Sequence, residues 1–238
     1  ANPPSLFPPE LLLMKTPLRA VIVGAGHRAL AYASFALHHP DQLQIVGVAD
    51  PLPHRRERAA RQFNIPPGHC FEHAEDLAAV PRFADFAING TMDHQHVPTT
   101  LPLLEAGYDV LLEKPFSTDL DELHRLEETV RRTGRKVAIC HVLRYAPFYA
   151  LIRQKVVEGA IGDIFNLQLV EHVSYHHYAV GFLRGKWAKP SVCKSSMLLA
   201  KCCHDLDLIA WMKSGVAPLR VASFGSNFQF TPDKAPAR

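Results

Sequence analysis

The sequence predicts an α/β protein in which a doubly wound parallel sheet precedes a smaller α+β region. Short apolar runs alternate with helical segments over residues 18–140, and a glycine-rich turn follows the first apolar run. From about residue 141 the pattern changes to alternating polar and apolar residues. We expect a flexible leader over 1–17, a complete first domain over 18–140 and a partial second domain over 141–238, as if the chain were shortened at its C-terminus.

Composition narrows the class of protein. The 238 residues are 47% hydrophobic and carry a formal net charge of +3, without a long basic run. We therefore expect a globular protein that has no nucleic-acid partner. The sequence contains no stretch of about 20 apolar residues, so no membrane span is expected. The five cysteines include no Cys-x-x-Cys pair, which favours a reducing, cytoplasmic location.

The first domain is predicted element by element from its apolar runs and helix stop signals. Strands are expected at 18–23, 43–49, 84–88, 109–112 and 136–140. Helices are expected at 29–38, 54–63, 97–106 and 119–133. Strand–helix–strand repetition with short connections indicates a parallel sheet that is covered on both faces.

The second region is expected to contain helices at about 146–158 and 202–212. Its two predicted strands, 163–173 and 221–230, alternate apolar and polar side chains, which is typical of a sheet with one covered face. We expect a largely antiparallel, open and incomplete sheet. Because open strand edges need a partner, a homo-oligomer is expected through this sheet.

The turn Gly24-Ala25-Gly26-His27-Arg28-Ala29 fits the pattern G-x-G-x-x-G/A between a strand and a helix. Gly24 permits the tight turn, Gly26 lets a pyrophosphate approach the backbone, and Ala29 allows the helix to touch a strand. The free N–H groups of the helix N-terminus would then hold the phosphates. The motif favours dinucleotide binding over the alternative, an ordinary turn.

Asp50 ends the second predicted strand, 26 residues after Gly24. A carboxylate at this place accepts hydrogen bonds from the adenosine ribose hydroxyls and repels a 2′-phosphate, which favours NAD over NADP. Arg55 and Arg56 lie nearby and keep NADP open as the alternative cofactor. A helix-capping aspartate is the alternative reading of Asp50.

The tripeptide Glu113-Lys114-Pro115 follows the strand at 109–112, where ligands of parallel sheets bind. Pro115 restricts Lys114 to an extended backbone and permits a cis peptide bond. A lysine beside a cationic nicotinamide loses its proton more readily, which would let it accept a proton near neutral pH. Taken alone, a Lys-Pro at a strand end is more often an exposed turn.

His204 precedes Asp205 and Asp207 at the start of the helix expected at 202–212. Carboxylates suit a helix N-terminus, and a histidine that titrates near neutral pH would serve as a second acid/base group. The alternative is a packed histidine with capping aspartates. A zinc site built from Cys193, Cys202 and Cys203 with His204 lacks regular ligand spacing, so no metal is expected.

Four motifs in order resemble the glucose–fructose oxidoreductase / inositol dehydrogenase / MocA group. They are Val21-Ile22-Val23-Gly24-Ala25-Gly26, Thr91 followed by His96, Glu113-Lys114-Pro115, and Lys201-Cys202-Cys203-His204-Asp205-Leu206-Asp207. The resemblance covers about 18–230. It implies a Rossmann domain, an α+β domain whose open sheet often forms the oligomer interface, and NAD(P)-dependent oxidation or reduction of sugars, polyols or related hydroxy compounds.

The resemblance also assigns roles to residues. Lys114 and His204 match the catalytic pair. The expected cofactor-binding residues are Gly24, Gly26, His27, Arg28, Asp50, Thr91, His96, Glu113 and Lys114. The expected substrate residues are Arg144, His176 and Lys201. Ala200 stands where the family often has an acid, and Lys201 is expected to take part of that role.

Further histidines and basic residues are predicted near the substrate, or in a solvated loop: His172, His176, His177, Arg184, Lys186 and Trp187. If they surround the substrate, a polar or anionic ligand is expected. The predicted function is therefore an NAD(P)-dependent dehydrogenase of CH–OH groups that acts on a small molecule. A non-catalytic dinucleotide sensor or pseudoenzyme is the alternative.

Overall fold

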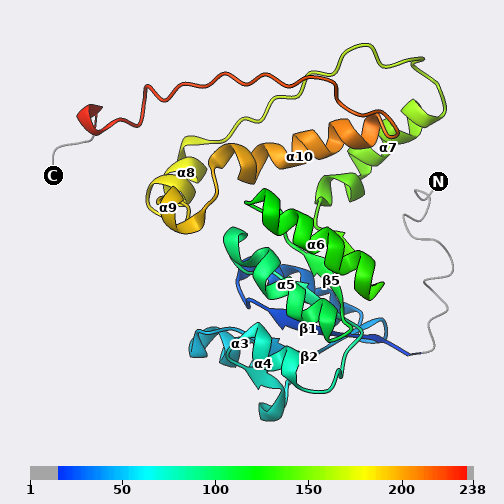
Figure 1. Cartoon of the computed structure of the whole chain (residues 1–238), viewed down its shortest axis with the longest axis vertical. Coiled ribbons are helices and arrows are strands. Elements are labelled where there is room, and N and C mark those ends of the chain that lie inside the picture. Colours follow the sequence, from blue (N-terminus) through cyan, green and yellow to red (C-terminus); the bar gives the residue numbers. More distant parts are fainter. Residues whose placement is uncertain (1–15, 235–238) are drawn as a thin grey trace.

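The structure, a computed structural model, describes residues 16–234, so most of the predicted leader lies outside the described residues. Its first region is built on one six-stranded parallel sheet in the order β3-β2-β1-β4-β5-β6 (Figure 1). The strands are β1 (Leu18–Val23), β2 (Leu43–Ala49), β3 (Cys70–Phe71), β4 (Phe86–Asn89), β5 (Asp109–Leu112) and β6 (Val137–Ile139). The predicted parallel sheet is thus confirmed, with β3 as an additional two-residue edge strand.

Apolar side chains project from both faces of this sheet, as expected for strands that consist of continuous apolar runs. Along β1, Ala20 and Ile22 join one buried cluster, whereas Val21 and Val23 join the other. Successive side chains of a strand point to opposite faces, so a strand covered on both sides cannot alternate with polar residues.

Helices complete the two layers. The cluster around Ile22 contains residues of α1 (His27–Ala33), α2 (Phe35–His38) and α3 (Pro53–Phe63). The cluster around Val21 contains residues of α4 (Ala74–Ala79), α5 (His96–Glu105) and α6 (Leu120–Thr133). Short 3₁₀ turns lie at η2 (Pro67–His69) and η3 (Asp93–Gln95). The helix predicted at 29–38 is divided near Ser34, and α4 is an element that the sequence pattern did not reveal.

The second region consists of helices and extended chain. It contains η4 (Val142–Tyr145), α7 (Pro147–Val157), α8 (Tyr175–Tyr178), a π-helix η5 (Ala179–Leu183), α9 (Pro190–Cys193), α10 (Met197–Met212) and η6 (Pro232–Lys234). Helix α10 lies beside α7, above the sheet domain in Figure 1. It starts five residues before the predicted 202, because the Ser196 side chain caps it by accepting the Leu199 N–H at 3.1 Å.

The predicted strands at 163–173 and 221–230 are not formed. Both segments run as extended chain without strand pairing in the described part of the region. Phe165 and Phe224 are fully exposed, at 103% and 97%. The alternation of side chains is a local property, whereas a strand also needs a neighbour for its backbone hydrogen bonds. The expected antiparallel open sheet is therefore absent from residues 141–234.

Across residues 16–234, no helix combines the length and apolar character needed to cross a membrane.

Candidate active site

A cavity of about 520 Å³ opens at the carboxyl ends of the central strands. The strand order reverses between β1 and β4, which is where open parallel sheets bind ligands. The chain contributes to its wall after β1, after β4 and after β5, and again from α8, η5 and α10 of the second region. Its lining includes Gly26, His27, Arg28, Thr91, Asp93, His96, Glu113, Lys114, His177, Lys186, Trp187, Ala200 and Lys201.

The glycine turn has the geometry that its motif predicts. Gly24 adopts φ +76°, and a Cβ there would lie 2.8 Å from the backbone nitrogen of Thr91. Ala29 is fully buried, and its Cβ lies 2.8 Å from where a Cβ on Gly90 would stand, so α1 and the end of β4 are in close contact. The first turn of a helix has N–H groups without helical partners, and here Gly26, His27 and Arg28 present that turn to the cavity.

Asp50 is 2% exposed, and its carboxylate accepts a hydrogen bond from the backbone of this turn. One carboxylate oxygen accepts the Ala25 N–H at 2.8 Å, and the other accepts the Leu52 N–H at 2.9 Å. Each oxygen keeps a second lone pair. Asp50 therefore fixes the shape of the turn, and its predicted contact with a ribose stays a prediction.

Asn89, which the sequence analysis missed, organises the loop after β4. Its side-chain oxygen accepts hydrogen bonds from the Thr91 hydroxyl at 2.8 Å and the Thr91 N–H at 3.2 Å. The His96 ring lies 2.7 Å from the Pro115 carbonyl through Nδ1 and 3.2 Å from the Thr91 carbonyl through Nε2. Burial lowers the pKa of His96. Thr91 and His96 both line the cavity, and His96 joins the loops after β4 and β5.

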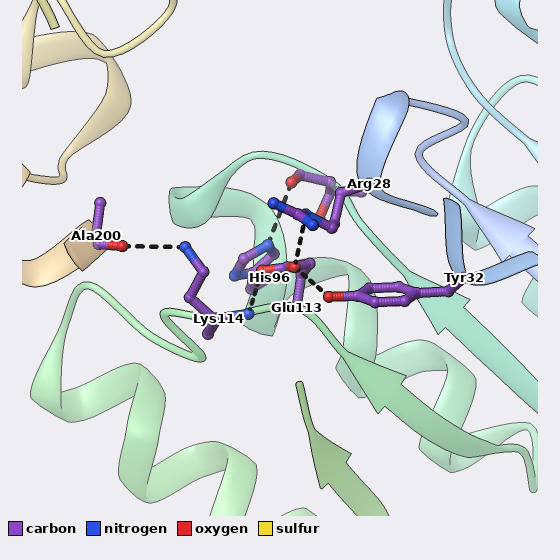
Figure 2. Close-up of polar contacts among 7 residues, drawn as sticks. Arg28, Tyr32, His96, Glu113, Lys114 and Ala200 are labelled. Atoms are coloured by element: carbon purple, nitrogen blue, oxygen red, sulfur yellow. Dashed lines mark hydrogen bonds and ion pairs between the residues drawn. The ribbon is translucent and has the colours of Figure 1, made fainter. Parts of the chain in front are cut away.

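Glu113 is the centre of a polar cluster on the floor of the site (Figure 2). Its carboxylate accepts the Tyr32 hydroxyl at 2.7 Å and the Lys114 N–H at 2.6 Å, and it pairs with Arg28 at 3.5 Å. Burial and the neighbouring carboxylate raise the pKa of Tyr32, which keeps its hydroxyl a donor. The buried carboxylate thus fixes the backbone of Lys114 and orients Arg28.

Lys114 points from the end of β5 toward the second region. Its ammonium donates to the carbonyl of Ala200 on α10 at 3.0 Å, across the cavity from its own strand. The Lys114–Pro115 peptide bond is cis, as the sequence allowed. The side chain therefore projects into the cavity between the two regions, and the alternative of an exposed turn is wrong.

His204 lies on α10 but is not among the described residues that line the cavity. Burial lowers its pKa to about 4, and the charges of Lys114 and His141 add to this effect while Asp207 opposes it. The His141 ring packs against it edge to face at 6.0 Å. His204 is therefore neutral at pH 7, and the expectation that it titrates near neutral pH is wrong because the sequence did not show its burial.

Arg144 and Asp207 form an ion pair that the sequence analysis assigned otherwise. The Arg144 guanidinium donates to both Asp207 oxygens, at 2.7 and 2.6 Å. Asp207 lies in the middle of α10 rather than at its start, because the helix begins at Met197. Arg144 does not line the cavity in the described structure, so its expected place beside a substrate is not supported.

The second region places His177 at the cavity, not the predicted His176. His176 is exposed and does not line the cavity within the described residues, whereas its neighbour His177 does, and its Nε2 lies 3.0 Å from Lys201 Nζ. Trp187 donates from its indole nitrogen to Asp93 at 3.0 Å and so connects the second region to the loop after β4. Sequence reasoning named both His177 and Trp187 only as members of a loop of uncertain role.

Cys193, Cys202, Cys203 and His204 form no metal site. Over residues 16–234 no group of three or more histidine, cysteine or acidic side chains is arranged to hold a metal ion.

Comparison with known proteins places the chain among oxidoreductases. Residues 18–141 match the GFO_IDH_MocA family model, described as an oxidoreductase family with an NAD-binding Rossmann fold. The putative oxidoreductase YteT of Bacillus subtilis is 27% identical over 177 residues, which are 69% of this chain and 41% of that protein. The inositol 2-dehydrogenase of Corynebacterium glutamicum strain R is 25% identical over 204 residues, or 84% of this chain and 55% of that enzyme.

A solved structure shares the fold. The inositol dehydrogenase homolog of Azotobacter vinelandii, complexed with NAD+, superposes with a TM-score of 0.73 at 21% identity, covering 84% of this chain and 55% of that one. The chain spans about half the length of the curated relatives it matches. Because the family match includes the complete parallel sheet and the glycine turn, the chain belongs to the Gfo/Idh/MocA family of oxidoreductases with an NAD-binding Rossmann fold.

Proposed function

We propose that this chain binds NAD(H) and oxidises or reduces a sugar, polyol or related hydroxy compound. The observation that carries the proposal is the convergence of the glycine turn, Lys114 and the second region on one cavity. The relatives named as inositol dehydrogenases support this class of substrate, and the NAD+ complex of the Azotobacter vinelandii homolog supports the cofactor.

The residues present fit a dinucleotide. A Cβ on Gly24 would collide with Thr91, which requires glycine at the tight turn, and at Gly26 the nearest atom to a Cβ is the Gly90 oxygen at 3.9 Å, so a phosphate can approach the backbone there. The N–H groups at the start of α1 would hold the pyrophosphate, with Arg28 beside them. Thr91, His96 and Glu113 line the wall that leads to Lys114, and these side chains would hold the nicotinamide half. Asp50 would accept the ribose hydroxyls through its remaining lone pairs.

When bound, the nicotinamide supplies hydride chemistry at the carbinol carbon of the substrate. In its neutral amine form Lys114 would take the hydroxyl proton on its ε-nitrogen as the carbonyl forms, and in the reverse direction its ammonium would return the proton. Ala200 and Glu113 hold Lys114 from its two ends, through the side chain and the backbone. His204 is not among the described residues that line the cavity, so it would assist through Lys114 rather than at the substrate, as an imidazole whose low pKa keeps it unprotonated at pH 7.

Cofactor binding is tested with Gly24→Val. The left-handed backbone alone costs a side chain about 1–2 kcal/mol, and the Thr91 backbone blocks its Cβ, so we expect NADH to bind at least about tenfold more weakly. Titration of NADH fluorescence measures the effect. Gly68→Ala is the control, because a Cβ there meets nothing within 4 Å. Equal binding by the two variants would contradict the proposed site.

The proton role is tested with Lys114→Ala. We expect turnover to fall by about 10²–10⁴-fold on whichever member of a polyol and sugar panel is active, with NADH binding retained. The exposed Lys136, changed to alanine, is the matched control. Normal turnover by the Lys114 variant would refute the role, and NADH binding without turnover of any panel member by the unmodified chain would favour a dinucleotide sensor.

A further inference from the structure

The cavity has more cationic side chains than its carboxylates can neutralise. Four lysine and arginine residues line it, against the two carboxylates of Asp93 and Glu113. Both carboxylates are already engaged, Asp93 by the Trp187 indole and Glu113 by Tyr32, Arg28 and the Lys114 backbone. Among the described residues, the lysines of the cavity have no carboxylate within 4.0 Å.

Lys201 is the lysine whose surroundings are best suited to an anion. It is partly buried, and its ammonium lies 3.0 Å from His177 Nε2. An ammonium has three N–H donors, so one contact with the histidine leaves two for a ligand. Burial lowers the pKa of Lys201, and the nearby charges of Lys114 and Arg28 lower it further, whereas Glu171 and Cys203 act in the other direction. An anion in the cavity would relieve this repulsion.

Lys201 also lies where a substrate would lie. Its neighbour in sequence, Ala200, accepts the hydrogen bond of Lys114, so the Lys114 ammonium reaches from the end of β5 to the part of α10 that carries Lys201. Ala200 itself presents only a methyl group as its side chain. A small ligand can therefore contact Lys114 with one group and Lys201 with another.

The cofactor phosphates do not account for Lys201. They would bind at the N–H groups of the glycine turn, whereas Lys201 belongs to α10 and follows Ala200, whose carbonyl accepts the Lys114 ammonium. Lys186 lines the cavity from the segment between η5 and α9. Lys201 is therefore the cavity cation next to the acceptor of Lys114, where the reacting hydroxyl would bind.

We propose that the substrate is a hydroxy compound with an anionic group, a carboxylate or a phosphate, and that Lys201, positioned by His177, binds this group while the reacting hydroxyl faces Lys114. The proposal rests on the proposed function, since it concerns the substrate half of the same cavity. It makes Lys201 a specificity-determining residue and separates this chain from dehydrogenases of neutral polyols.

The test uses matched pairs that differ in charge: D-glucuronate against D-glucose, and D-galacturonate against D-galactose. D-Glucose 6-phosphate is added to distinguish a phosphate from a carboxylate. The protein is first saturated with NADH, and each compound is then titrated by calorimetry. We expect at least one anionic compound to bind about tenfold more tightly than its neutral counterpart, because hydrogen bonds to charged groups are the stronger ones. This preference falls as salt is raised.

Lys201→Met removes the charge and retains an unbranched side chain of nearly the same length. We expect it to reduce binding of the anionic compounds to that of their neutral counterparts, and Lys201→Arg to retain the preference. Lys189→Met, at an exposed lysine outside the cavity lining, is the control and should behave as the unmodified chain. Equal binding of charged and neutral compounds by the unmodified chain, or a preference that survives in Lys201→Met, would overturn the proposal.

Failure of the proposed function gives a different result. If NADH itself does not bind, the proposed function is wrong, and the same pairs are titrated into the protein without cofactor. A charge preference that depends on Lys201 then still supports the anion site, and its absence contradicts it.

Discussion

The two regions of the chain differ in how their apolar side chains are used. In the sheet region, Leu104 and Tyr108 are fully buried between the sheet and its helices. In the second region, Leu219 and Phe224 are both 97% exposed, and the buried apolar residues are few and scattered. The sheet region therefore has its own core. The second region depends on contacts with the first, such as the Lys114–Ala200 and Trp187–Asp93 hydrogen bonds.

This difference matters for the site because the two regions supply different parts of it. The glycine turn and the Glu113 cluster belong to the region with the packed core, which keeps them in a fixed geometry. His177 and Lys201 come from the region with little core of its own. We therefore expect cofactor binding to be robust and substrate binding to be sensitive to changes in the second region.

The largest expected effect comes from the core of the sheet region. Leu104→Ala should lower the free energy of unfolding by about 2–5 kcal/mol, because it leaves a cavity in a fully buried cluster. Phe224→Ala, its counterpart in the second region, should change it by less than about 0.5 kcal/mol. Urea unfolding followed by circular dichroism measures both. Similar losses in the two variants, or a loss in Phe224→Ala that depends on protein concentration, would show that the second region buries this phenylalanine in solution.

The next effect concerns the ion pair that joins α10 to η4. Asp207→Asn should cost about 2 kcal/mol, since it removes the charge from a nearly buried carboxylate that accepts two bonds from Arg144. Both tryptophans of the chain, Trp187 and Trp211, lie in the second region, so tryptophan fluorescence follows its unfolding.

The matched control is Glu127→Gln, which removes an equally short but exposed pair with Arg131 and should cost less than about 0.5 kcal/mol. NADH binding should be unchanged in both variants. A fluorescence transition that does not move in Asp207→Asn would contradict the role of this pair in the second region.

A smaller loss of stability and of turnover is expected from a change at Tyr32, on the floor of the site. Tyr32→Phe removes one hydrogen bond from Glu113, which keeps Arg28 and the Lys114 N–H as partners. We expect a loss of about 1 kcal/mol in stability and less than a tenfold fall in turnover. Tyr145→Phe, at a tyrosine that is 72% exposed, is the control and should have neither effect. A tenfold or greater loss of turnover in Tyr32→Phe would mean that Glu113 alone cannot hold Lys114.

The last prediction concerns the pH dependence of stability. The pKa of His204 is about 4 in the folded chain and 6.5 without the fold, so between these values the unfolded chain binds a proton that the folded chain excludes. The free energy of unfolding should therefore fall as the pH falls from about 6.5 to 4. In His204→Gln this fall should be smaller, although His141 and His96, whose pKa values are also lowered, keep part of it.

The exposed His172, changed to glutamine, is the control for this measurement and should leave the slope of stability against pH as it is. A slope that His204→Gln does not reduce would mean that His204 is more open to water than the structure indicates.

Much of the sheet region could be predicted because its strands and its glycine turn are determined by residues that are close together in the sequence. The run Asp109–Leu112 was predicted with its observed bounds, and the glycine turn was placed between strand and helix. An apolar strand and a left-handed glycine are encoded within a few residues. The missed elements, β3 and α4, are short, with two and six residues.

The second region could be predicted less well because its structure depends on partners distant in sequence. Polar and apolar side chains do alternate over 163–173, but among the described residues no neighbouring strand pairs with this segment. Arg144 was expected at a substrate, yet its partner is Asp207, 63 residues away. His177 rather than His176 reaches the cavity, a choice that the turn of α8 makes.

By itself the sequence determined the parallel sheet, the glycine turn, the family and the candidacy of Lys114, because each follows from short patterns and their order along the chain. Only the tertiary structure decided which side chains meet at the cavity, that Asp50 supports the turn, that burial lowers the pKa of His204, and that no carboxylate among the described residues lies within 4.0 Å of the Lys201 ammonium. These properties depend on burial and on charges that the chain brings together from distant positions, and neither can be read from neighbouring residues.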